Sequence, residues 1–108
     1  MNNNLIIVRG DSHTFTLTLT DSVGAALDLT GADLTFTVKD MFAKTVGAGI
    51  TVSAPLTGVA VVAVDPEDTE GAPDVRVEYL YDTQVDLSDG TRVTPIRGKF
   101  IVLPDVTV

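Results

Sequence analysis

The chain has 108 residues, of which 44% are hydrophobic and 20% charged, so it can bury one hydrophobic core without disulfide bonds or metal ions to stabilise it. Its length argues against a second domain. The absence of cysteine excludes a disulfide framework and thiolate metal ligands, and favours folding in a reducing cytoplasm. The net charge is −8, and residues 65–89 hold nine acidic side chains with Arg76 as their one basic residue. Because phosphate neutralisation needs a basic surface, this charge disfavours nucleic-acid binding.

The first half of the chain predicts short strands. Residues 5–8 form an apolar run that is too short for a membrane span or a signal-peptide core, so we expect no membrane association. Residues 14–20 and 34–39 alternate between apolar and polar side chains, which is typical of half-buried strands. Residues 40–46 break the alternation and predict one helical turn, with Asp40 as its cap.

The middle of the chain continues the pattern with less alternation. Residues 50–53 predict a short strand and residues 54–58 a turn. Residues 59–64 are apolar and rich in valine, a run that is long enough for a strand and too short for a helix. Residues 65–74 form a polar connection that contains two prolines and a glycine.

The end of the chain predicts a long β-hairpin. Residues 75–87 and 92–103 are extended segments joined at Asp89-Gly90, and glycine readily accepts the positive φ that hairpin turns need. Together the segments predict one domain over residues 1–108, an all-β, immunoglobulin-like antiparallel β-sandwich of about seven strands. Residues 104–108 form either a loose tail or a segment that adds to a neighbouring sheet.

Several short motifs have a functional and a structural interpretation. Arg9-Gly10-Asp11 matches an integrin-binding tripeptide, but we interpret it as a turn between two strands. The oxygen-bearing residues 86–90 are spaced as in calcium loops, yet a hairpin turn uses the same residue types and no bidentate glutamate follows. His13 lies beside a serine and an aspartate in an extended segment, where neighbouring side chains cannot converge as a catalytic triad does. Residues 67–70 carry three carboxylates, which we interpret as a solvated loop.

These interpretations predict a protein that is not an enzyme and has no catalytic residues, cofactor or metal site. The candidate interaction surface is instead a set of threonines, because threonine is uncharged and has little rotamer entropy to lose at an interface. The alternative is an ordinary exposed sheet face. The candidate residues are Thr14, Thr16, Thr18, Thr20, Thr35 and Thr37.

Three segments in this order resemble the immunoglobulin-like N-terminal domain of the tailed-phage upper baseplate protein and related small phage virion proteins. They include Arg9-Gly10-Asp11-Ser12 with Phe15-Thr16-Leu17, then residues 27–39, then Tyr81-Asp82-Thr83-Gln84-Val85, Asp89-Gly90, Thr94, Gly98-Lys99-Phe100-Ile101-Val102 and Asp105-Val106-Thr107.

The resemblance implies a non-enzymatic bacteriophage or prophage structural protein, located in the virion and used as a baseplate or tail adaptor or on a capsid surface. Its expected partners are other virion proteins and further copies of itself. The alternative function is a stand-alone immunoglobulin-like module that binds a carbohydrate or a host surface.

Overall fold

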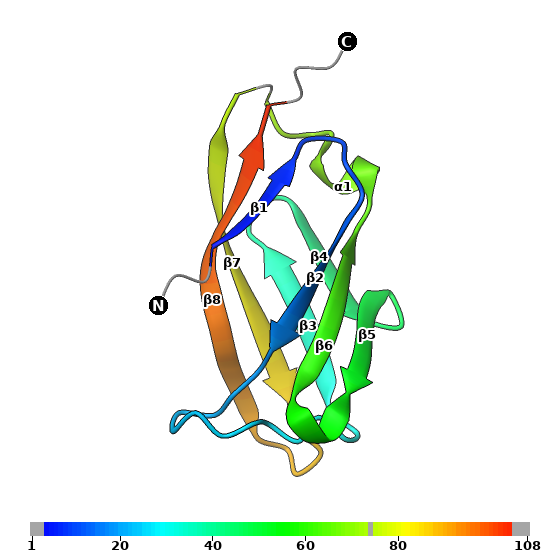
Figure 1. Ribbon diagram of the computed structural model, residues 1–108, viewed down its shortest axis with the longest axis vertical. Coiled ribbons are helices and arrows are strands. Elements are labelled where there is room, and N and C mark those ends of the chain that lie inside the picture. Colours follow the sequence, from blue (N-terminus) through cyan, green and yellow to red (C-terminus); the bar gives the residue numbers. More distant parts are fainter. Residues whose placement is uncertain (1–3, 74, 105–108) are drawn as a thin grey trace.

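The fold is all-β, as the sequence predicts. The computed structural model describes residues 4–73 and 75–104, so most of the predicted 104–108 tail lies outside the described residues. The elements in chain order are β1 (Leu5–Val8), β2 (His13–Thr18), β3 (Asp33–Val38), β4 (Phe42–Val46), β5 (Gly49–Ala54), the 3₁₀ turn η1 (Pro55–Thr57), β6 (Val59–Val64), α1 (Pro66–Thr69), β7 (Val77–Asp86) and β8 (Arg92–Leu103) (Figure 1).

The eight strands form one hydrogen-bonded sheet in the order β1-β8-β7-β3-β4-β5-β6-β2. The two edge strands, β1 and β2, are joined by only four residues, 9–12. Because that connection spans at most about 18 Å, the sheet must curl until its edges lie near each other, which gives a nearly closed barrel.

This arrangement differs from the expected sandwich in two ways. The sheet has eight strands, and it is mixed, because β1 runs parallel to β8 and β4 parallel to β5. The β4–β5 contact comprises only two residue pairs around a tight turn, and it links a layer of β1, β8, β7, β3 and β4 to a layer of β5, β6 and β2. In Figure 1, β2 and β6 lie in front of β3.

The two layers enclose one core because their inward positions alternate as the sequence predicts. Phe15 of β2 meets Phe100 of β8 with ring centroids 6.0 Å apart, and Phe100 lies 6.4 Å from Phe36 of β3. Edge-to-face contacts between aromatic rings are favourable, and the Phe15–Phe100 contact joins the two layers. The largest fully buried side chains are those of Phe36, Phe100, Leu19, Leu29, Leu34, Val38, Val62, Val64, Val85, Val102, Thr69 and Thr83.

Two local predictions were wrong. Residues 42–46 form strand β4 instead of a helical turn, and Asp40 does not cap a helix but lies at φ 64° in the turn between β3 and β4. The polar connection after β6 contains the short helix α1. Asp65 is its N-cap, Pro66 begins it, and Asp65 and Asp68 form a capping box, a signature that is readable in the sequence.

The hairpin prediction is confirmed. Strands β7 and β8 pair antiparallel from Val77–Val102 to Asp86–Arg92, with one register shift between Thr83 and Val85. In the turn, Leu87 N–H donates to Thr91 O at 2.7 Å, and Gly90 has a φ of 93°. This hairpin carries the outer surface on which a groove lies.

Candidate interaction surfaces

The structure divides the six candidate threonines between two surfaces. Thr14, Thr16 and Thr18 are exposed on β2, whereas Thr35 and Thr37 are half-buried on β3. Strands β2 and β3 belong to opposite layers and both turn their apolar residues into the same core. Their threonines therefore point away from each other. Thr20 lies beyond the end of β2 and forms an isolated bridge with Ala26.

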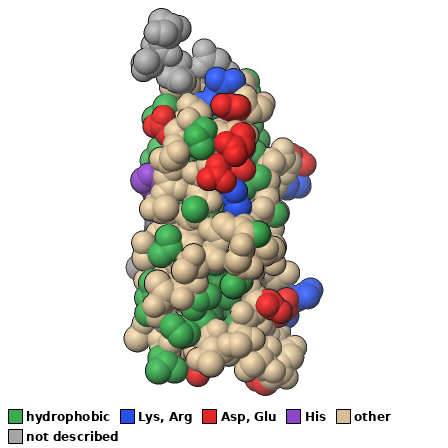
Figure 2. Space-filling model, turned by 90° about the vertical axis from the view of Figure 1, so that its right-hand side faces the viewer, with side chains coloured by type: hydrophobic (Ala, Val, Ile, Leu, Met, Phe, Trp, Pro, Cys, Tyr) green, Lys and Arg blue, Asp and Glu red, His purple; other side chains and the backbone are tan. Residues whose placement is uncertain are grey.

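The threonines of β2 belong to an uncharged surface that we call the neutral face, the outward side of β2, β6 and β5. The β2 threonines pair across to the outward residues of β6: Thr14 with Ala63, Thr16 with Val61 and Thr18 with Val59. The neutral face consists of Thr14, Thr16, Thr18, Thr51, Ser53, Val59, Val61 and Ala63. Figure 2 views the molecule from the β5 side, where most of the visible charged side chains gather towards the upper end.

The second surface is a groove of about 880 Å³ on the outer side of β3, β7 and β8. It is lined by Leu80 of β7, a residue that is 61% exposed. Lys99 of β8 pairs with Leu80 on one side, and on the other side Lys39 donates its backbone N–H to Leu80 O at 2.8 Å. In the next row Thr37, Asp82 and Arg97 lie across the three strands.

The groove is lined by charged side chains of both signs, Lys39, Arg97 and Lys99 with Asp40 and Asp82. Lys99 Nζ contacts Glu78 at 3.1 Å, and the hydrogen bonds from Lys99 and Arg76 hold the pKa of Glu78 below its usual range. In the part of the chain that the structure describes, Lys39 and Arg97 take part in none of the ion pairs. The groove therefore presents the exposed aliphatic side chain of Leu80 among side chains of both charges.

The sequence prediction missed this groove, apart from Thr37. Leu80 is the feature of the sequence that could have revealed it, because the other outward positions of β7 are polar, namely Glu78, Asp82, Gln84 and Asp86. An apolar residue at an outward position of an amphipathic strand breaks the alternation and marks a surface contact or an exposed patch.

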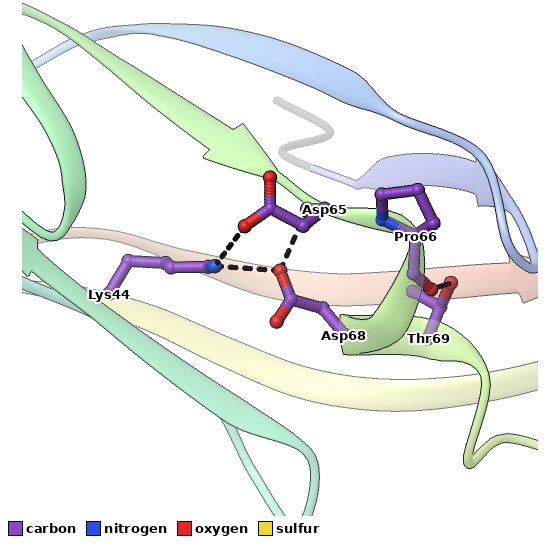
Figure 3. A network of polar contacts seen from close by, with 5 residues as sticks. All are labelled: Lys44, Asp65, Pro66, Asp68 and Thr69. Atoms are coloured by element: carbon purple, nitrogen blue, oxygen red, sulfur yellow. Dashed lines mark hydrogen bonds and ion pairs between the residues drawn. The ribbon is translucent and has the colours of Figure 1, made fainter.

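A polar network closes the end of the molecule around α1 (Figure 3). The nearly buried Lys44 Nζ of β4 lies 2.7 Å from Asp68 and 3.4 Å from Asp65. Burial by itself disfavours the charged ammonium, but the hydrogen bonds and charges of Asp68 and Asp65 outweigh it and raise the pKa of Lys44. The acidic stretch is therefore partly structural, because two of its carboxylates fix α1 to β4.

The Arg9-Gly10-Asp11 tripeptide lies at the same end and is used structurally. The Arg9 guanidinium donates to Ala72 O at 2.8 Å and to Glu70 O at 2.7 Å, and Gly10 N–H donates to the Thr69 hydroxyl at 2.8 Å. An arginine held in this way is not presented to a receptor, so the geometry supports the interpretation as a turn.

The other motifs also occupy structural positions. Asp86 accepts a hydrogen bond from Arg92 at 2.6 Å, and Asp89 accepts one from Thr91 N–H at 2.9 Å, as expected for a hairpin turn. His13 is exposed and packs its ring 4.5 Å from that of Phe15. Over residues 4–73 and 75–104, no three His, Cys, Asp or Glu side chains are grouped in a way that could hold a metal ion.

No protein-family model matches the sequence, and no curated protein matches it. Among the described residues, no helix is long and apolar enough to cross a membrane.

Proposed function

We propose that the chain is a non-enzymatic structural protein of a bacteriophage or prophage particle, which acts by protein–protein assembly as a baseplate or tail adaptor or on the capsid surface. The observation that carries this proposal is the neutral face. On a chain with a net charge of −8, eight outward positions over three adjacent strands carry no charge. Such a surface can contact another protein without the cost of desolvating ions.

The immunoglobulin-like architecture is part of the proposal, and the strand order supports it. Strands β3, β7 and β8 neighbour one another as C, F and G do in an immunoglobulin sandwich, with β4 beside β3 as C′ lies beside C. Strands β2, β6 and β5 follow the order B, E and D. The short β4–β5 contact then joins two sheets that the immunoglobulin fold keeps apart. In this interpretation β1, which pairs with β8, leaves the position beside β2 open.

The test is the fractionation of phage particles from a bacterial culture that expresses the chain. Particles are banded by density, washed in high salt and examined with an antibody against the chain. We expect the chain to band with the particles and to resist the wash. Recovery of the chain only from the soluble fraction, with intact particles that lack it, would contradict the proposal. A small unrelated cytoplasmic protein serves as the control for entrapment.

The second candidate is a stand-alone immunoglobulin-like module that binds a carbohydrate or a host surface. The groove around Leu80 favours it, because the cationic side chains of Lys39 and Arg97, which form no ion pair within the described residues, would suit an acidic group such as a uronic acid. A glycan array separates the two functions. This candidate requires a hit among acidic glycans that disappears in the Lys39→Ala and Arg97→Ala variants, whereas binding that survives both substitutions would rule out the groove as the site.

A further inference from the structure

The free edge of β2 is the strongest unpartnered feature of the described chain. Strand β2 lies at one end of the sheet order, and within residues 4–73 and 75–104 its one partner strand is β6. Although the short connection brings β1 near this edge, β1 is hydrogen-bonded to β8 and does not pair with β2. The exposed backbone of such an edge is a template for another strand.

The register shows which residues present that backbone. In an antiparallel pair, residues alternate between exchanging hydrogen bonds with the partner strand and pointing their backbone groups away from it. Leu19 N–H donates to Gly58 O at 2.8 Å, and the alternating positions Leu17 and Phe15 face Ala60 and Val62 in the same register. The intervening Thr14, Thr16 and Thr18 therefore direct their N–H and C=O groups toward the open edge.

Nothing in the sequence of β2 protects this edge. Natural edge strands are usually blocked by lysine, proline, an inward charge or a bulge. Strand β2 reads His-Thr-Phe-Thr-Leu-Thr, with none of these residues, and its pairing with β6 has no register shift. The three threonine side chains are exposed beside the free backbone groups.

We propose that two copies of this chain associate through their β2 edges, as antiparallel neighbours related by a twofold axis at Thr16. Thr16 then faces Thr16 of the other copy, and Thr14 faces Thr18, with each pair exchanging both backbone hydrogen bonds. The pattern Thr14-Phe15-Thr16-Leu17-Thr18 is symmetric about its centre in the alternation of threonine and apolar residues. The pairing extends β5-β6-β2 into one sheet across both copies and places threonines opposite threonines, a favourable cross-strand pair.

Charge favours a second copy at this edge over other surfaces of the same chain. Each copy carries a net charge of −8, and β2 and the neutral face are where two such copies approach with the least repulsion. The nearest acidic residues, Asp11 and Asp21, flank the strand at its two ends, and the pairing brings the Asp11 end of one copy near the Asp21 end of the other. Association should therefore strengthen as salt screens this repulsion.

The inference rests on the proposed assembly function, and two pairs of matched variants test it. In the paired edge the two Thr16 Cα atoms lie about 5.5 Å apart, within disulfide range. Because the chain has no cysteine, mild oxidation of Thr16→Cys should give a covalent dimer. The control is Thr51→Cys, at an exposed position of β5 on the same face.

The second pair is Thr16→Lys and Thr51→Lys, which make the same charge change on and off the edge. In sedimentation at micromolar concentration and 0.5 M salt, we expect wild type and Thr51→Lys to form dimers, and Thr16→Lys to dissociate at least about tenfold more readily, since it places like charges opposite each other. Unfolding midpoints check that each variant is folded.

Three outcomes would overturn the pairing: wild-type protein that stays monomeric, a dimer that Thr16→Lys leaves unchanged, or cross-linking that is no faster at Thr16→Cys than at Thr51→Cys. A strand from another protein would produce the first. A chain that enters phage particles but stays monomeric overturns the β2 pairing alone, whereas absence from particles overturns the proposed function.

Discussion

Two fully buried threonines differ in whether their hydroxyl groups have partners, so the same substitution should change stability in opposite directions. Both side chains are 0% exposed. The Thr69 hydroxyl accepts a hydrogen bond from Gly10 N–H at 2.8 Å and donates to Pro66 O at 3.4 Å. Within the described residues, the Thr83 hydroxyl has no hydrogen-bond partner. Valine has nearly the same shape as threonine and lacks the hydroxyl.

The magnitudes follow from what each hydroxyl does. On folding, the Thr83 hydroxyl loses its hydrogen bonds to water and makes none within the described protein. Valine removes this buried polar group, so the free energy of unfolding should rise by about 1–2 kcal/mol. At Thr69, valine leaves Gly10 N–H without its acceptor and loosens the junction between the β1–β2 connection and α1. The free energy of unfolding should then fall by about 1–3 kcal/mol.

The assay is urea unfolding of the wild type, Thr69→Val and Thr83→Val, followed by circular dichroism. With a urea m-value of about 1–3 kcal/mol/M, a change of 1 kcal/mol moves the unfolding midpoint by about 0.3–1 M, so both effects are well above error. A Thr83→Val variant that is less stable than wild type, or a Thr69→Val variant of unchanged stability, would refute the assignment of these two hydroxyls.

The remaining predictions concern a glycine and an ion pair. Gly58 has a φ of 72°, and an added Cβ would lie 2.4 Å from Leu19 O, whereas Gly24 has a φ of 87° and an added Cβ there would have nothing within 4 Å. In thermal unfolding, Gly58→Ala should lower the free energy of unfolding by more than about 2 kcal/mol, and Gly24→Ala by about 1 kcal/mol. Lys44→Met should lower stability at pH 7 by about 1–3 kcal/mol, because it leaves Asp68 without its charged donor. Since the folded-state pKa of Lys44 lies above its ordinary value of 10.5, the contribution of the ammonium is full below that pH and is lost as the pH rises through the folded-state pKa. Wild type and Lys44→Met should thus converge in strongly alkaline solution, and a gap that stays constant to pH 12 would show that the charge of Lys44 contributes nothing.

Residue periodicity and turn chemistry predicted most of the strands. Residues 59–64 form β6 with the predicted bounds, and the turn at Asp89-Gly90 joins β7 to β8. These features depend on neighbours in sequence, which is why the sequence alone reveals them. Residues 42–46 were missed as a strand because β4 is exposed or half-buried along its whole length, so its sequence carries little alternation.

The arrangement of the surfaces could not be predicted in the same way. The six threonines look alike in sequence, and only the long-range pairings put Thr16 and Thr37 on opposite sides of the molecule. The parallel pairing of β1 with β8, which leaves β2 uncovered, joins residues about as far apart as the chain allows. The groove likewise depends on three strands that the fold brings together, although the apolar Leu80 at an outward position of β7 could have indicated a surface contact.

The copy number of the chain in purified phage particles tests the central claim of a virion component most directly. It is measured by mass spectrometry against labelled peptide standards, with a known tail or capsid protein as the internal reference. The proposed function predicts a fixed ratio to that reference across independent preparations, and the β2 pairing predicts an even number of copies per particle. A trace amount that varies between preparations and falls on washing would contradict a structural role in the particle.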